Sequence, residues 1–158
     1  MIYGSIGSIS HGTLRPEDLI PTFSRELRWL VKANSEARGR FGTQYTYTER
    51  EANLVALCDE ADAIENFDSD TAHEVLEQLF DALDAYAPPY CYFGATEGDG
   101  SDFGFWLCDM DNTDLPRYSD LAAVPADISE CYIVNDHGNV SFASRGEDGE
   151  LHSIWSIV

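Results

Sequence analysis

Basic residues are scarce in this chain, and most of the few present lie in its first third. Nine Lys and Arg stand against twenty-nine Asp and Glu in 158 residues, which gives a formal net charge of −20. Residues 1–50 hold seven of the nine bases, whereas residues 51–116 hold seventeen carboxylates and no Lys or Arg. Because a polyanion repels a phosphate backbone, we expect no direct binding to nucleic acid.

Signals for membranes, secretion and metals are also missing. No apolar run approaches the roughly 18 residues of a membrane span, and the first residues do not form a secretion signal, so we expect a cytoplasmic protein without a membrane partner. No C-x-x-C pair, H-x-x-x-H pair or glycine-rich phosphate loop occurs. We therefore expect no metal site, no cofactor and no enzymatic activity. In the reducing cytoplasm the cysteines are expected to be buried free thiols: Cys58, Cys91, Cys108 and Cys131.

The apolar pattern predicts a single α+β domain over residues 1–158. Two or three N-terminal amphipathic helices, within about residues 14–87, are expected to pack on a C-terminal antiparallel sheet of about four to five strands, within about residues 90–158. Pro16 begins the first helical region, which Pro21 is expected to interrupt. Residues 48–51 match a capping box for the second helix, and residues 68–70 supply N-cap candidates for the third.

The strands are predicted from alternating residues and turn signals. Residues 90–95 and 102–108 flank one turn-rich segment, and residues 130–135 and 139–145 flank a turn in which a glycine suits a positive φ. A last strand is expected after residue 149. Residues 2–10 are compatible with an edge strand or an extended arm.

The third predicted helix carries a row of carboxylates opposite its apolar face. Spacings of 4, 3, 4 and 3 place five of them on one side of a helix. At a rise of about 1.5 Å per residue the row is about 21 Å long, and its charge spacing approaches the roughly 3.4 Å between phosphates along one DNA strand. We call this row the acidic stripe: Asp70, Glu74, Glu77, Asp81 and Asp84. A shorter row on the second helix consists of Asp59, Asp62 and Glu65.

A solvated polar face and salt adaptation are the ordinary explanations for such acids. However, like charges at i,i+4 destabilise a helix by roughly 0.2–0.5 kcal/mol each, so the stripe costs about 1–2 kcal/mol. No Lys interrupts it, and the net-positive first fifty residues argue against a proteome-wide acidic bias. These observations favour a negative field that serves binding.

A fixed array of carboxylates attracts sites that evolved to hold phosphates. The first hypothesis is a nucleic-acid mimic whose stripe and shorter row occupy the positively charged site of a DNA- or RNA-binding protein. Residues 8–20 and 89–106 resemble small proteins of phages and mobile elements, and in composition and size the chain is similar to anti-restriction and anti-CRISPR proteins that mimic DNA. The resembling segments imply a mobile-element context, and the mimic hypothesis names a restriction enzyme, a CRISPR effector or another nuclease as the target. A homodimer, which would lengthen the acidic surface, is a further possibility that the sequence leaves undecided.

Two further hypotheses remain. The first is an immunity or antitoxin-like protein that neutralises one basic toxin through aromatic anchors on the hairpin. The hairpin aromatics are Tyr90, Tyr92, Phe103, Phe105 and Trp106, and alternation places about half of them in the core. Tyr92, Phe103 and Trp106 are the proposed anchors. The second is a calcium-binding protein, because residues 109–114 resemble the start of a calcium loop and residues 97–102 form another acidic turn; neither completes the EF-hand pattern. Arg25, Arg28 and Lys32 are expected to form ion pairs that hold the first helix to the acidic body.

Overall fold

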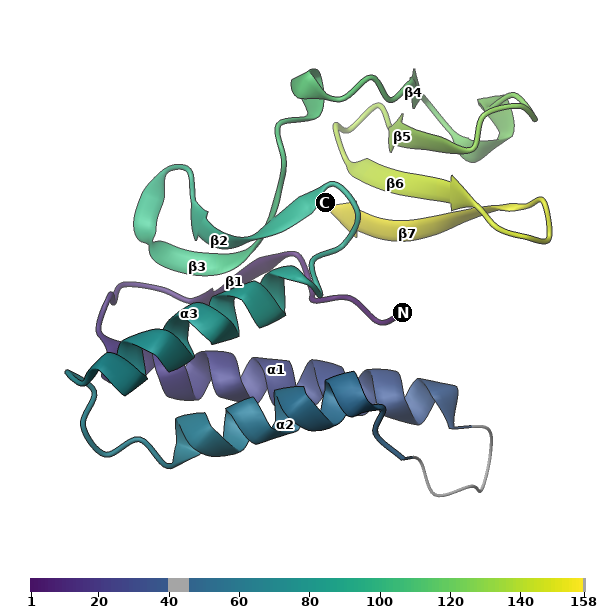
Figure 1. Ribbon diagram of the computed structural model, residues 1–158. Coiled ribbons are helices and arrows are strands. Elements are labelled where there is room, and N and C mark those ends of the chain that lie inside the picture. The colour runs from purple at the N-terminus through teal and green to yellow at the C-terminus, as the bar shows by residue number, and fades with distance from the viewer. Residues whose placement is uncertain (40–45, 158) are drawn as a thin grey trace. The chain divides into compact units, whose positions relative to one another are not determined.

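The computed structural model describes residues 1–39 and 46–157, and the α+β class predicted from the sequence is confirmed (Figure 1). The chain divides into two compact units, Met1–Cys108 and Asp109–Val158. The boundary follows the first hairpin, so the three α-helices and one sheet belong to the first unit, and two short 3-10 helices, Met110–Asn112 and Leu121–Ala123, belong to the second. The prediction of one domain over residues 1–158 stays a prediction.

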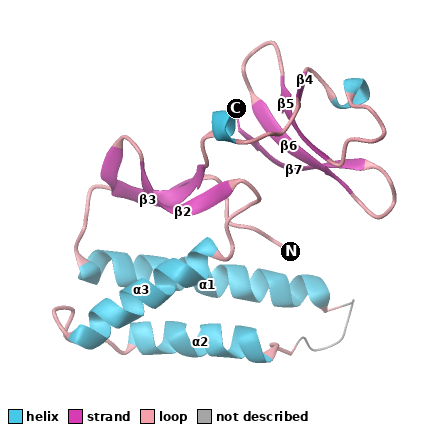
Figure 2. Cartoon of the chain, turned by 45° about the horizontal axis from the view of Figure 1, so that its top comes forward, coloured by secondary structure: helices cyan, strands magenta, loops and turns pink. Residues whose placement is uncertain are grey.

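The first unit contains three helices and three strands. Its sheet has the order β1-β3-β2 with antiparallel pairing throughout its named strands, and β1 lies at one edge, as one of the two alternatives for residues 2–10 proposed. Figure 2 shows the helices together on one side of this sheet. The elements are β1 (Gly7–Ser10), α1 (Pro16–Arg38), α2 (Glu49–Asp62), α3 (Asp70–Asp84), β2 (Cys91–Thr96) and β3 (Asp99–Leu107).

Two of the helices begin where the sequence indicated. Thr48 caps α2: its side chain accepts a hydrogen bond from Glu51 N, and the Glu51 side chain accepts one from Thr48 N. Ser69 caps α3, because its hydroxyl accepts a bond from Ala72 N at 3.1 Å. Each cap satisfies N–H groups that have no partner within the helix. The local sequence therefore determines both starting points.

The expected break at Pro21 is wrong, because α1 runs without interruption from Pro16 to Arg38. Pro21 lacks one N–H and therefore removes one hydrogen bond near the start of a 23-residue helix. Its ring is exposed, while the helix buries Leu19, Ile20 and Phe23 on its other side. Burial of this apolar face outweighs the missing bond.

The core of the first unit lies between α1, α3 and the sheet. Phe23 of α1 is fully buried, and its ring contacts the rings of Phe80 of α3, Phe93 of β2 and Phe103 of β3. The helices supply most of the remaining buried aliphatic side chains. Helices and sheet therefore share one apolar core. Because α3 turns its apolar side towards this core, its opposite, acidic side faces solvent.

Strands β1 and β3 approach each other closely at Gly104. A Cβ atom added there would lie 2.0 Å from the carbonyl oxygen of Gly7, a backbone atom that cannot turn away. We expect Gly104→Ala to lower the free energy of unfolding by about 2 kcal/mol through overpacking, measured by urea titration followed by circular dichroism at 222 nm. Gly94→Ala is the matched control: Gly94 lies opposite Gly104, and its added Cβ would meet only the Tyr92 side chain at 3.4 Å. Equal losses for the two variants would contradict this account.

The second unit is a separate four-stranded sheet, so the strands form two sheets where the sequence suggested one. Its order is β4-β5-β6-β7, with β4 parallel to β5 and the other pairs antiparallel. Tyr132, Phe142 and Trp155 contact one another as its aromatic core. Gly138 has the positive φ expected in the β5–β6 turn. The strands are β4 (Arg117–Tyr118), β5 (Glu130–Val134), β6 (Val140–Arg145) and β7 (Leu151–Ile157).

All four cysteines are free thiols, although only two are buried. Cys58 and Cys131 lie in the cores of their units, as expected. Cys91 is half-buried, and burial raises the pKa of its thiol to about 12. Cys108 is exposed, which corrects its expected burial, because it follows the last residue of β3. Among the described helices, none is long and apolar enough to cross a membrane.

Candidate partner-binding surface

The first four carboxylates of the acidic stripe face solvent along α3. The helix buries Ala72, Val75, Leu79 and Leu83 against the core, and this leaves the opposite side exposed. Within residues 1–39 and 46–157, no Lys, Arg or His nitrogen lies within 4.0 Å of any of these carboxylates. They form an exposed and uncompensated row: Asp70, Glu74, Glu77 and Asp81.

Asp84, the last member of the stripe, has a structural contact. Its Oδ1 accepts a hydrogen bond of 2.8 Å from the backbone N–H of Phe93. A carboxylate at a helix C-terminus is disfavoured by the helix dipole, and this bond to β2 offsets that effect. Asp84 therefore ties α3 to the sheet. Its partner lies nine residues further along the chain and is not evident from helical spacing.

The shorter acidic row on α2 is partly neutralised. Arg28 of α1 donates from Nη1 to Asp59 at 2.9 Å and from Nη2 to Asp62 at 2.7 Å. The hydrogen bond to Asp59 is the main cause that raises the Arg28 pKa. Asp59 and Asp62 therefore face α1 and hold two helices together, as expected for Arg28. Glu65 is exposed beyond the end of α2.

Lys32 and Arg25, the other two cations that were expected to pair, do not hold α1 to the acidic body. Lys32 lies 3.8 Å from Glu36 on the same helix. Arg25 has no Asp or Glu oxygen within 4.0 Å among the residues that the structure describes. The expected ion pairing across helices is thus confirmed for Arg28 alone of the three, and the stripe on α3 is not covered by them.

The hairpin aromatics divide between the two faces of the sheet, as alternation predicted. Phe103 and Phe105 are buried in the core, so Phe103 is unavailable as an anchor for a partner. Tyr92 and Trp106 lie opposite each other on β2 and β3 and are half-buried. Trp106 Nε1 donates to the Gly94 carbonyl at 2.9 Å. Only Tyr92 and Trp106 of the three proposed anchors keep partly exposed rings.

The acidic segment 109–114 is engaged with its own neighbours. Asp109 accepts bonds from Asp111 N at 2.9 Å and from the Asn112 side chain at 2.8 Å. Asp111 forms an ion pair of 2.6 Å with Arg117. The described residues contain no group of three or more His, Cys, Asp or Glu side chains arranged to hold a metal ion. The geometry therefore gives no support to the calcium hypothesis.

The four exposed carboxylates of α3 are thus the part of the acidic stripe that stays without an ion pair among the described residues. Comparisons with protein-family models, with curated proteins and with solved structures found no match to the chain.

Proposed function

We propose that this protein is an inhibitor that occupies the positively charged nucleic-acid site of a DNA-binding protein, such as a restriction enzyme or a CRISPR effector. The observation that carries the proposal is the row of four exposed carboxylates on α3, with no described cation within 4.0 Å. From Asp70 to Asp81 the row spans about 16 Å. One strand of B-DNA holds about five phosphates over that length.

The physical basis is competition for the same basic groove. A row of like charges costs helix stability, and the net charge of −20 adds a long-range field that steers a cationic partner towards the protein. When the Lys and Arg of such a site neutralise phosphates, the cations condensed on the nucleic acid are released, and a carboxylate row that replaces the phosphates in part would release its own counterions in the same way. Binding should therefore weaken as the salt concentration rises.

The test is a double charge reversal, Glu74→Lys with Asp81→Lys. Purified restriction endonuclease and Cas9-type effector would each be bound to a fluorescent DNA duplex, and displacement by this protein would be followed by anisotropy at two salt concentrations. We expect wild-type protein to displace DNA from at least one target, and the double variant to need about tenfold to a hundredfold more protein.

The matched control is Asp136→Lys with Glu147→Lys, which makes the same change in net charge on two exposed turns of the second unit. This control should keep most of the inhibition, because the field of the stripe is intact. Equal losses of DNA displacement in the two double variants would show that only the net charge of the protein matters, and would contradict a specific binding site on α3. Tight binding to one basic toxin that persists in high salt would instead support the immunity alternative.

A further inference from the structure

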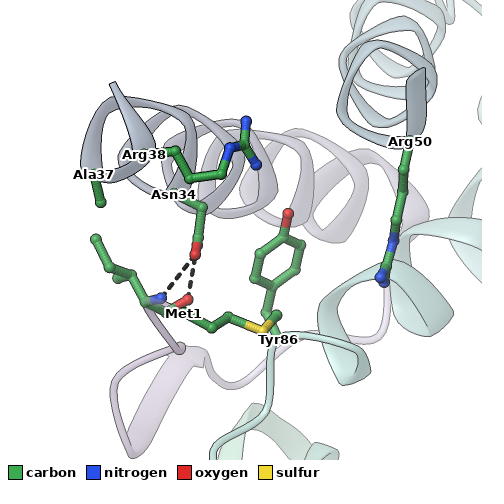
Figure 3. A pocket seen from close by; sticks show the side chains of 7 residues that line it. Met1, Asn34, Ala37, Arg38, Arg50 and Tyr86 are labelled. Atoms are coloured by element: carbon green, nitrogen blue, oxygen red, sulfur yellow. Dashed lines mark hydrogen bonds between the residues drawn. The ribbon is translucent and has the colours of Figure 1, made fainter. Parts of the chain in front are cut away.

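A pocket of about 460 Å³ lies where the N-terminal segment meets the end of α1 and the start of α2. Tyr86, two residues after the C-terminal end of α3, completes the lining. This lining combines apolar side chains with the guanidinium groups of Arg38 and Arg50 (Figure 3). Pockets of this volume commonly hold small organic molecules. The chain has only nine Lys and Arg, and two of them line this one pocket, which favours an anionic ligand.

One wall of the pocket is held in place by Asn34 of α1. The Asn34 side chain accepts a hydrogen bond from Ile2 N at 2.7 Å and donates one to Ile2 O at 2.8 Å, as the dashed lines in Figure 3 show. Gly4 N also donates to the carbonyl of Tyr86 at 2.9 Å. These bonds fasten the N-terminal segment beside the helices. The pocket is therefore built before any ligand arrives.

The charges at the pocket do not cancel. Both Nη atoms of Arg38 donate to the carboxylate of Glu51, at 2.6 and 2.5 Å. Arg50 has no Asp or Glu oxygen within 4.0 Å among the described residues. Arg50 is therefore the guanidinium group at this pocket that no described carboxylate neutralises, and it can bind an anion.

Tyr86 supplies a second, uncharged group. Its side chain is only 4% exposed, its ring stands between Arg38 and Arg50 in Figure 3, and its hydroxyl makes no hydrogen bond to a described residue. Burial, and next the charge of Glu51, raise the Tyr86 pKa, while Arg50 and Arg38 lower it less. The hydroxyl therefore keeps its proton at neutral pH. The hydroxyl can therefore donate a hydrogen bond to an acceptor bound in the pocket.

We propose that this pocket binds a small organic acid whose single carboxylate contacts Arg50 and the Tyr86 hydroxyl, with its apolar body against Ile2 and Ala37. A guanidinium group can bind both oxygens of a carboxylate. Because Arg38 is already paired with Glu51, one carboxylate would neutralise the remaining guanidinium group, that of Arg50. This site involves no carboxylate of the acidic stripe and is independent of the inhibitor proposal.

Benzoate is a suitable probe, titrated into the full-length ¹⁵N-labelled protein and followed by amide chemical shifts. We expect saturable shifts centred on residues 34–38, 50 and 86, with a Kd of about 1 mM or below. Arg50→Gln should weaken binding about tenfold, and Tyr86→Phe about fivefold. Arg25→Gln is the matched control, because Arg25 is exposed on α1 and has no described acidic partner; it should change the Kd by less than about twofold.

Three results would overturn the proposal. The first is equal binding by the Arg50 and Arg25 variants. The second is binding of benzyl alcohol, the neutral analogue, as tight as that of benzoate. The third is inorganic phosphate that saturates the same residues while benzoate does not, which would assign the pocket to phosphate. Circular dichroism at 222 nm confirms that each variant is folded before it is titrated.

Discussion

Replacing Phe23 with alanine is expected to lower the free energy of unfolding by about 4 kcal/mol. Phe23 has no exposed surface, and its ring centroid lies 5.1 Å from that of Phe80, 5.2 Å from Phe93 and 5.8 Å from Phe103, each in an edge orientation. These three rings belong to α3, β2 and β3. Truncation would therefore open a cavity at the point where the helices meet the sheet.

The measurement follows from where the helices lie. All three belong to the unit Met1–Cys108, so urea unfolding followed at 222 nm reports on that unit. Trp29→Ala is the control on the same helix: Trp29 is 52% exposed, and its loss should change the free energy of unfolding by less than about 0.5 kcal/mol. A loss below about 1 kcal/mol for the Phe23 variant would show that the site collapses around the missing ring.

The helices could be predicted because their signals are local. Periodic apolar residues and the caps at Thr48 and Ser69 are read within a few positions of each other, and both caps are present. The division of the strands into two sheets was not predictable in the same way. Strand β1 pairs with β3 about 95 residues away in sequence, and such pairing depends on packing that no local pattern encodes.

The same distinction applies to the candidate site. Helical spacing placed the acidic stripe on one exposed face of α3, as the structure has it. Three of the predicted partner-binding carboxylates are occupied by contacts within the protein that join residues distant in sequence. Arg28 binds Asp59 and Asp62 more than thirty positions away, and Asp84 accepts a bond from the backbone of Phe93. The pocket around Arg50 also depends on four separate segments. Charge patterns therefore predict exposure, whereas ion pairing requires the fold.

Replacing Glu51 with glutamine is expected to lower the free energy of unfolding by about 2 kcal/mol, because the hydrogen bonds from Arg38 to a carboxylate are stronger than those to a neutral amide. The Glu51 side chain is 6% exposed, and its carboxylate accepts two bonds from Arg38 and one of 2.9 Å from Thr48 N. Glu49→Gln makes the same chemical change at an exposed position in the first turn of α2. It should cost less than about 0.5 kcal/mol.

The pH dependence separates the charge of Glu51 from its packing. Hydrogen bonds from Arg38 are the main cause that lowers the pKa of Glu51 from 4.5 to about 2. Between these values the unfolded chain takes up a proton at Glu51 that the folded chain does not, so this contribution to stability is complete above about pH 5 and declines as the pH falls towards 2. The difference in unfolding free energy between wild type and Glu51→Gln should shrink over that window. A Glu51 difference that stays constant from pH 6 down to about pH 3 would contradict an ionised, paired Glu51 and leave only its shape and hydrogen bonds to explain the loss.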